Sequence, residues 1–268
     1  MSYYASDVKK MQKRGAFMNN CAVILAGGEG KRMKSDLPKP LVRLLDKPLL
    51  QWVIESVKKA GIDDICVVKG YKKECIEDFV ATLPYEVETV YQSERLGTGH
   101  AVMMAKDFLS RHNGNVVILN GDAPFMDFET ISSALKLHTD TNSVATVISA
   151  EVEDPTGYGR IIRDKEGAFL KIVEQKDGTP EELKVREVNS GGFWFSCEKL
   201  LSVLGEIKSN NKAKEYYLPD ALAILLEKGE RVEAYTALNP DSVLGANDPQ
   251  QLEELNELAR SKGYNTDI

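Results

Sequence analysis

The residues best suited to chemistry lie in a glycine-rich segment, residues 26–39, which directly follows a short apolar run. Glycines leave backbone N–H groups free to surround an anion, and they allow a phosphate or a base to approach the backbone closely. Arg32 and Lys39 add cationic partners for a triphosphate and for charge that develops as it reacts. The spacing matches neither the Walker A loop nor the G-x-G-x-x-G motif, and a purely structural turn is an equal alternative for this segment alone.

A second glycine-containing segment, residues 92–101, joins a predicted strand to a predicted helix. The side-chain amide of Gln92 both donates and accepts hydrogen bonds, so it is suited to reading the edge of a base. Gly97 and Thr98 offer backbone and hydroxyl contacts. The alternative is structural: Thr98 caps the helix, with Gly97 in the turn before it.

A metal site is predicted where a third apolar run ends, at residues 120–124. Asp122 is well placed there to hold Mg²⁺, which takes one or two protein oxygens together with phosphates and water. A second oxygen ligand has to come from elsewhere in the chain, and Asn247 is the candidate. Asp122 could equally cap the turn that follows it.

The elements that position these segments alternate between strand and helix. Short apolar runs predict strands, and segments with one apolar face predict helices. The expected strands are residues 21–26, 64–69, 87–92 and 115–120, and the expected helices are residues 48–61, 72–81 and 101–108. This order predicts an α/β fold with a mostly parallel sheet and helices on both faces, and ligands bind at the carboxyl edge of such a sheet.

From about residue 151 the pattern changes to a smaller group of mixed strands. We expect strands at 160–163, 169–173 and 187–195, then a helix at 217–227, a strand at 231–235 and a helix at 249–260. We interpret residues 21–262 as one domain with a nucleotide lobe (about 21–150), a second-substrate lobe (about 151–246) and a closing helix (249–260). Residues 1–20 lack the apolar stretch of a secretory signal, and we place them outside the core.

Composition narrows the class of protein. The net charge of −7 argues against broad nucleic-acid binding, and no run of eighteen apolar residues indicates a membrane span. The four cysteines, Cys21, Cys66, Cys75 and Cys197, show no metal-ligand spacing. Three of them lie in apolar runs, so we expect core packing for those three and a reducing cytoplasm. The three histidines form no cluster and receive no catalytic role; they are His100, His112 and His138.

Taken in order, these segments resemble the uridylyltransferase domain of bacterial N-acetylglucosamine-1-phosphate uridylyltransferases, within the sugar-phosphate nucleotidyltransferase superfamily. The motifs run from about residue 21 to 260 and are LAGGEGKRMKSDLPKPL, QSERLGTGHA, NGDAP, DPTGYGRI, VEQKD, VNSGG, KEYYLPD and GAND. The resemblance implies a Rossmann-like fold. It also implies Mg²⁺-dependent transfer of a uridylyl group from UTP to N-acetylglucosamine 1-phosphate. The products are pyrophosphate and UDP-N-acetylglucosamine, a peptidoglycan precursor for the cell wall.

The resemblance implies a role at each matching position. The nucleotide would lie on Leu25, Ala26, Gly27, Gly28, Gln92, Gly97 and Thr98, and its phosphates on the catalytic pair Arg32 and Lys39. Mg²⁺ would be held by Asp122 and Asn247, and the sugar or ribose by Gly159, Glu174, Asn189 and Tyr217.

Three positions depart from the family. Lys31 replaces a threonine in the loop, Asn120 stands where an aromatic residue is frequent, and Pro219 replaces a threonine near the acetamido group. Because Pro219 lacks a hydroxyl and an N–H, glucose 1-phosphate with UTP or dTTP is an alternative pair. A non-catalytic nucleotide-sugar sensor is a further alternative, disfavoured by the retained metal and phosphate residues.

The full-length enzymes of this family also carry a C-terminal β-helix with acetyltransferase activity, which mediates trimerisation. No hexapeptide repeat follows residue 260. We therefore expect no acetyltransferase activity and a monomer or weak homo-oligomer.

Overall fold

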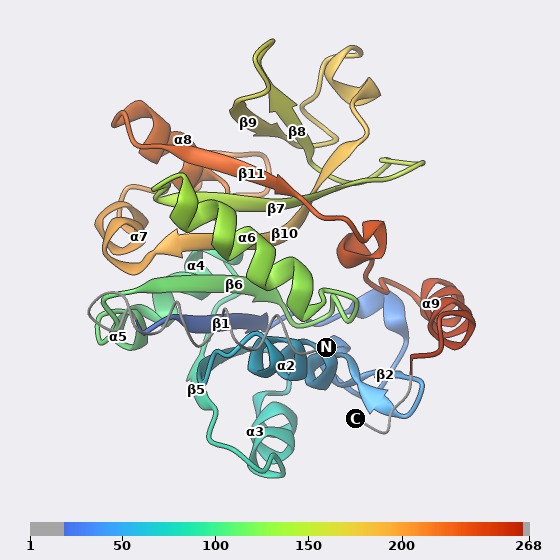
Figure 1. The fold of residues 1–268 in the computed structure, drawn as a ribbon. Helices are drawn as coiled ribbons and strands as arrows, with labels where there is room; N and C mark the ends of the chain where they lie inside the picture. Colours follow the sequence, from blue (N-terminus) through green and yellow to red (C-terminus); the bar gives the residue numbers. More distant parts are fainter. Residues whose placement is uncertain (1–18, 265–268) are drawn as a thin grey trace, which may run out of the picture.

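The computed structural model describes residues 19–264, and a nine-stranded sheet forms its centre (Figure 1). Four parallel strands make one half of the sheet, in the order β5 (Glu88–Tyr91), β4 (Asp64–Lys69), β1 (Cys21–Ala26) and β6 (Asn115–Asn120). Because these strands are parallel, their carboxyl ends meet at one edge. The register places Ala26 beside Lys69 and Leu25 beside Asn120 there.

The other half of the sheet contains a reversed strand. β10 (Glu187–Ser196) runs antiparallel between β6 and β7 (Ala145–Glu151), and β11 (Val232–Thr236) runs parallel to β7. β8 (Arg160–Arg163) pairs with β10 and with β9 (Phe169–Val173), so these two strands project from the main sheet (Figure 1). A two-stranded sheet is formed by β2 (Arg43–Leu44) and β3 (Lys47–Pro48).

Helices cover both faces of the main sheet because both faces of its strands are apolar. In β1, Cys21 and Val23 pack into one core, and Ala22 and Ile24 pack into the other. The first core is covered by α4 (Thr98–Met104), α5 (Lys106–Leu109), α7 (Cys197–Leu204) and α8 (Asp220–Glu227), and the second by α2 (Leu49–Lys59), α3 (Lys73–Ala81) and α6 (Phe128–Asp140). This three-layer arrangement confirms the predicted α/β, Rossmann-like fold class.

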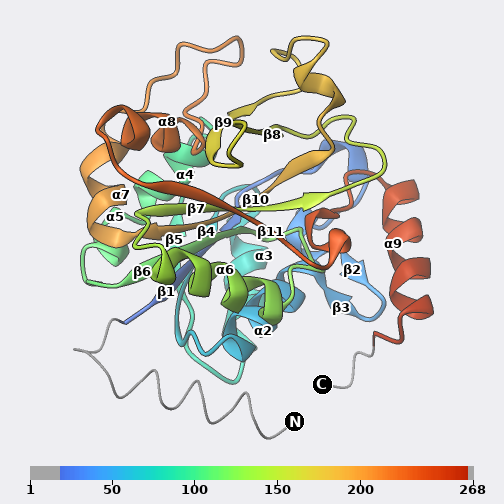
Figure 2. The ribbon, with the colours of Figure 1, turned by 45° about the horizontal axis from the view of Figure 1, so that its top comes forward.

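The last helix packs at one end of the molecule. α9 (Pro249–Ser261) lies beside the β2–β3 hairpin (Figure 2), and its Leu255 and Ala259 share an apolar cluster with Trp52 and Phe125. Asp248 caps this helix by accepting a hydrogen bond from the backbone N–H of Gln251 at 2.9 Å. Short 3₁₀ turns occur at η1 (Lys31–Met33), η2 (Lys39–Leu41), η3 (Glu182–Lys184) and η4 (Pro240–Val243).

Several element boundaries differ from the predictions. The helix expected at 101–108 is two short helices interrupted at Ala105. The helix expected from residue 217 begins at Asp220, and Pro48 caps α2 rather than lying in its first turn. α6, β7 and α7 had not been predicted, and the strand expected at 187–195 extends into the main sheet between β6 and β7.

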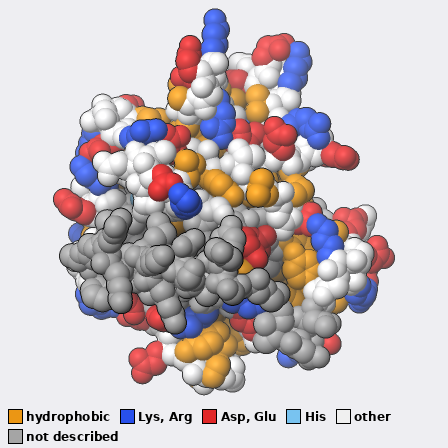
Figure 3. Space-filling view, viewed as in Figure 1, with side chains coloured by type: hydrophobic (Ala, Val, Ile, Leu, Met, Phe, Trp, Pro, Cys, Tyr) orange, Lys and Arg blue, Asp and Glu red, His pale blue; other side chains and the backbone are white. Residues whose placement is uncertain are grey.

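Three of the cysteines lie in the core, as expected, and most charged side chains of the described residues lie on the surface. Cys21, Cys66 and Cys197 are buried and all four cysteines are free thiols, which confirms the prediction of core packing. Within residues 19–264, no helix is long and apolar enough to cross a membrane. On the face shown in Figure 3, acidic and basic side chains of the described residues are interspersed.

Candidate active site

The glycine loop after β1 lies directly against the loop after β4. The backbone N–H of Tyr71 donates to the carbonyl of Gly27 at 3.2 Å. A Cβ added to Gly70 would lie 2.7 Å from the carbonyl oxygen of Gly27 and 2.8 Å from its Cα, so only glycine fits there. Gly28 differs, because a Cβ there would meet nothing within 4 Å. Gly28 therefore faces open space.

Lys39 lies under this loop. Gly30 has φ +63° and packs so closely that a Cβ on it would lie 2.6 Å from Cβ of Lys39. The Lys39 ammonium forms an ion pair with Asp122 and donates to Oδ1 of Asn247 at 2.9 Å. The structure thus brings together the predicted phosphate ligand and both predicted metal ligands, from segments far apart in the sequence. The carboxylate of Asp122 faces Lys39, so the alternative of a simple turn cap is not what the structure shows.

The same geometry tests whether the residues suit a magnesium ion. A carboxylate oxygen of Asp122 and the amide oxygen of Asn247 converge on one cationic atom, the ammonium nitrogen of Lys39. Hard oxygen donors are the ligands that Mg²⁺ prefers, and it usually takes few from protein. Within residues 19–264, no three or more aspartate, glutamate, histidine or cysteine side chains are placed so that they could hold a metal ion together. The donor set therefore suits Mg²⁺ completed by substrate phosphates and water.

The opposite side of the loop carries charges that the sequence analysis missed. Glu29 forms an ion pair with Arg95, which bridges the glycine loop to the segment after β5, and it lies 3.7 Å from Lys31. The hydrogen bond from Arg95 lowers the pKa of Glu29. Arg32 is exposed on η1, and the structure records no hydrogen bond or ion pair for it within the described residues.

The segment after β5 holds the side chain of Gln92. Its amide nitrogen Nε2 lies 3.1 Å from the carbonyl of Gly97 and 3.1 Å from Nδ1 of His100. The backbone N–H of Leu218 donates to the hydroxyl of Thr98 at 3.0 Å. Gly97, with φ +102°, takes the N-cap position of α4. The alternative in which Thr98 caps this helix is therefore wrong, and the Thr98 hydroxyl instead ties the segment after β5 to residue 218.

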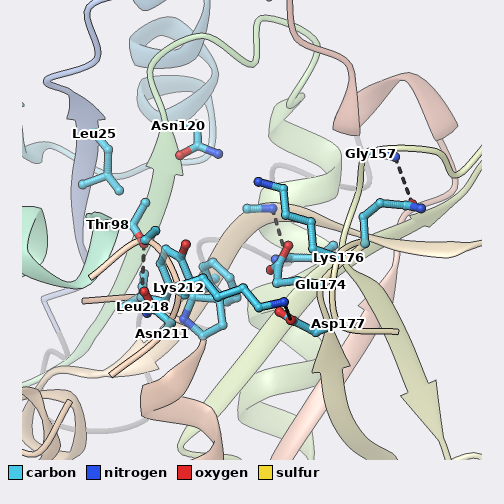
Figure 4. A pocket seen from close by; sticks show the side chains of 17 residues that line it. Leu25, Thr98, Asn120, Gly157, Glu174, Lys176, Asp177, Asn211, Lys212 and Leu218 are labelled. Carbon is cyan, nitrogen blue, oxygen red and sulfur yellow. Dashed lines mark hydrogen bonds and ion pairs between the residues drawn. The ribbon is translucent and has the colours of Figure 1, made fainter. Parts of the chain in front are cut away.

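A cavity of about 370 Å³ opens beside these segments. Figure 4 shows Leu25, Thr98 and Asn120 on one side of it, and Glu174, Lys176 and Asp177 on the other. Of the predicted site residues it is lined by Leu25, Thr98, Glu174, Asn189 and Tyr217, but not by Ala26, Gly27, Gly28, Arg32, Lys39, Gln92, Gly97, Asp122, Gly159 or Asn247. The predicted sugar residues and the predicted phosphate residues thus occupy neighbouring regions.

The polar residues of the cavity are held by backbone geometry. Asn189 precedes a break in the β10–β7 register at 189–192, and its Oδ1 accepts from the N–H of Gly191 at 2.9 Å. This break in register is a β-bulge, and it turns Asn189 toward the cavity. A Cβ on Gly159 would lie 3.2 Å from Oε1 of Glu174, so Gly159 leaves room for that carboxylate. Burial, helped by Asp177, raises the pKa of Glu174.

Two of the departures from the family lie in this cavity. Asn120 and Pro219 both line it, and Tyr217 stands between the cavity and solvent in the turn before α8. Asn120 packs against Gly191, where a Cβ would lie 2.2 Å from its Nδ2. Two of the three departures from the resembled family therefore change the lining of the same cavity.

Comparison with known proteins decides the family. Residues 21–240 match the family model described as nucleotidyl transferase. The chain belongs to the nucleotidyl transferase family. Its relatives include proteins named bifunctional protein GlmU from Acetivibrio thermocellus (42% identity), Clostridium novyi (44%) and Halalkalibacterium halodurans (41%). The matches cover 90–91% of this chain but 52–53% of those proteins, so the chain spans about half their length.

Membership of the nucleotidyl transferase family confirms the predicted superfamily. The assigned roles of individual residues stay predictions. No role was predicted for Gly70, Glu29, Arg95 or His100. Gly70 directly follows β4 as Gly27 directly follows β1, and glycines after two adjacent parallel strands were the available signal for their contact. The other contacts depend on tertiary structure and leave no local pattern.

Proposed function

We propose that this chain transfers a uridylyl group from UTP to N-acetylglucosamine 1-phosphate and releases pyrophosphate. The observation that carries the proposal is the convergence of Lys39, Asp122 and Asn247 beside a cavity that contains Glu174 and Asn189. This arrangement suits two anionic substrates that must be held together. The family match and the resemblance to N-acetylglucosamine-1-phosphate uridylyltransferases support the choice of substrates.

The reaction proposed is an in-line displacement at phosphorus. A phosphate oxygen of the sugar 1-phosphate attacks the α-phosphorus of UTP, a new P–O bond forms, and the bond to the β-phosphate breaks. The nucleophile is already an anion, so no general base and no covalent enzyme intermediate are required. Correct alignment of the two reactants contributes on the order of 7–11 kcal/mol in favourable cases.

The cationic side chains offset the repulsion between the two substrates. Lys39 is held in place by Asp122 and Asn247, with its side chain only 13% exposed, so its charge acts in a partly desolvated site. Arg32 on the exposed η1 turn adds a second cation, which is free to close on the pyrophosphate. Fixed charges near a site where negative charge moves stabilise the transition state.

Asp122 and Asn247 would hold Mg²⁺ when substrates bind. The ion would supply further neutralisation of phosphate charge and would polarise the bond that breaks. The side chains of Glu174 and Asn189 would accept and donate hydrogen bonds to hydroxyl groups of the sugar or the ribose. Gln92, Gly97 and Thr98 would hold the base.

Location and assembly are also proposals. We place the chain in the cytoplasm, where both substrates are made and where its four free cysteines would stay reduced. We propose a monomer or weak homo-oligomer. Light scattering at several protein concentrations tests this, and a stable trimer would contradict it.

The experiment that tests the function measures pyrophosphate release against a panel of nucleotides and sugar phosphates. We expect the highest kcat/KM with UTP and N-acetylglucosamine 1-phosphate, and a fall of at least about 100-fold in Lys39→Ala and Asp122→Ala. Asp140→Ala removes an equally acidic side chain whose ion pair with Lys136 is exposed on α6, and it serves as the control. Wild-type rates in the two site variants would show that the assignment is wrong, and UTP binding without pyrophosphate release would favour a sensor.

A further inference from the structure

Gln92 is a buried polar side chain whose orientation is fixed by its neighbours. Gln92 is only 5% exposed, and its Nε2 lies 3.1 Å from the carbonyl oxygen of Gly97. A carbonyl oxygen only accepts hydrogen bonds. The end of the Gln92 amide that faces Gly97 is therefore the NH₂ group, which donates.

The same NH₂ group determines which nitrogen of His100 faces Gln92 as an acceptor. Nδ1 of His100 lies 3.1 Å from Nε2 of Gln92. Because Nε2 of Gln92 donates, Nδ1 of His100 accepts this hydrogen bond. Both hydrogens of the Gln92 amide are then used, one by Gly97 and one by His100. Rotation of the amide by half a turn would break both hydrogen bonds.

The first turn of α4 keeps His100 in this position. The backbone N–H of Gly99 donates to the carbonyl of Tyr216 at 2.7 Å. The ring of Tyr216 lies beside the imidazole, with 6.2 Å between the ring centroids. His100 is thus positioned by the segment that precedes Tyr217 in the cavity wall.

The carbonyl oxygen of Gln92 points to the glycine loop. A Cβ added to Gly27 would lie 3.0 Å from Oε1 of Gln92, and no donor to Oε1 occurs in residues 19–264. The molecule therefore presents one oriented acceptor beside the loop that is proposed to hold the nucleotide.

We infer that His100 is a positioning residue that locks the Gln92 amide with its oxygen toward the base, which selects a base carrying an N–H at that position. Uracil carries a hydrogen on N3, whereas N3 of cytosine is an unprotonated acceptor that would oppose the oxygen of Gln92. The inference rests on the proposed function for the place of the nucleotide. It adds that the choice of uracil over cytosine depends on a residue that does not touch the base.

The test is equilibrium binding of UTP and of CTP, with Mg²⁺ present, to the full chain and to variants of residue 100. His100→Leu removes the acceptor. His100→Asn keeps an oxygen close to the place of Nδ1, and so it is the conservative rescue. His112→Leu is the matched control, because His112 also packs on an aromatic ring, that of Phe108, and contacts Asp64 at the amino end of β4. Thermal unfolding of every variant checks that it is folded.

We expect His100→Leu to lower the ratio of UTP affinity to CTP affinity about tenfold, the size of one net hydrogen bond. His100→Asn is expected to retain the wild-type ratio within about threefold, and His112→Leu to leave it unchanged. If His100→Leu does not fold, His100→Phe gives the same measurement, because it keeps a ring beside Tyr216 without an acceptor.

An unchanged ratio in the folded variant without an acceptor would overturn the inference, and so would equal losses in His100→Leu and His100→Asn. A wild-type protein with no preference for UTP over CTP would overturn it as well. Pyrophosphate release by the wild type is measured in parallel. Selective UTP binding without release would remove the proposed function and leave the role of His100 standing.

Discussion

Substitution of Gly70 tests directly how the glycine loop after β1 packs against the loop after β4. The substitution Gly70→Ala places a methyl group 2.7 Å from the carbonyl oxygen of Gly27 and 2.8 Å from its Cα. Both distances are short by about 0.7–1 Å relative to ordinary van der Waals contact. The atoms in the way belong to backbone rather than to a flexible side chain, so the two loops have to separate.

The expected cost follows from this overlap. Forcing one extra carbon into a packed site destabilises a protein by about 1–3 kcal/mol, which lowers the melting temperature of a chain of this size by about 3–9 °C. Separation also breaks the hydrogen bond from Tyr71 to Gly27 and moves Gly27 away from Gln92. Affinity for UTP is therefore expected to fall together with stability.

The assay combines urea unfolding with UTP titration, and Gly205→Ala is the control. Gly205 has φ −72° and ψ −10°, and a Cβ there would meet nothing within 4 Å. Because alanine restricts the unfolded chain, we expect Gly205→Ala to be neutral or stabilising by up to about 1 kcal/mol. If Gly70→Ala were as stable as Gly205→Ala and bound UTP as wild type does, the close approach of the two loops would be refuted.

Three further predictions concern metal, packing and pH. Removal of divalent cations with EDTA should abolish pyrophosphate release, and excess Mg²⁺ should restore it. Arg163→Met should cost about 3 kcal/mol in urea unfolding, because it leaves the half-buried carboxylate of Glu187 without the guanidinium that donates to both of its oxygens at 2.7 Å. Burial lowers the pKa of His138 to about 4. Below about pH 6.5 the unfolded chain therefore binds a proton at this residue that the folded state does not bind. The free energy of unfolding should fall by about 3 kcal/mol from pH 6.5 to 4, and urea unfolding should show a smaller loss in His138→Gln.

Three strands of the parallel half of the sheet, β1, β4 and β6, were predictable because they are buried on both faces. Such strands read as unbroken apolar runs, and residues 21–26, 64–69 and 115–120 became strands with the predicted bounds. The position of β10 was not predictable. Its apolar residues indicate a strand, but nothing local shows that it runs antiparallel between β6 and β7, because pairing is decided by the tertiary structure.

For the site, too, local sequence patterns predicted which segments lie together, but not the contacts that depend on the tertiary structure. Parallel strands bring their carboxyl ends together, so the sequence predicted that the segments after β1, β5 and β6 would be neighbours. It did not show that the ammonium of Lys39 lies between Asp122 and Asn247, although it named all three residues. That contact requires a residue after η4 to approach the end of β6, and the chain supplies it through a turn whose Gly245 would place a Cβ 3.0 Å from the carbonyl of Asp122.

If the cavity holds the sugar as proposed, the choice of sugar depends on contacts that form only in the tertiary structure. Asn120 and Pro219 lie 99 positions apart in the sequence, but they line the same cavity. Gly191 has φ +77°, and a Cβ on it would lie only 2.2 Å from Nδ2 of Asn120, so there is little space between residues 120 and 191. An aromatic residue at position 120 would need a different path for the β10 bulge. Asparagine at 120 and the bulge that orients Asn189 are therefore coupled, and positions 120 and 219, which both depart from the pattern of the resembled family, line one cavity rather than separate features.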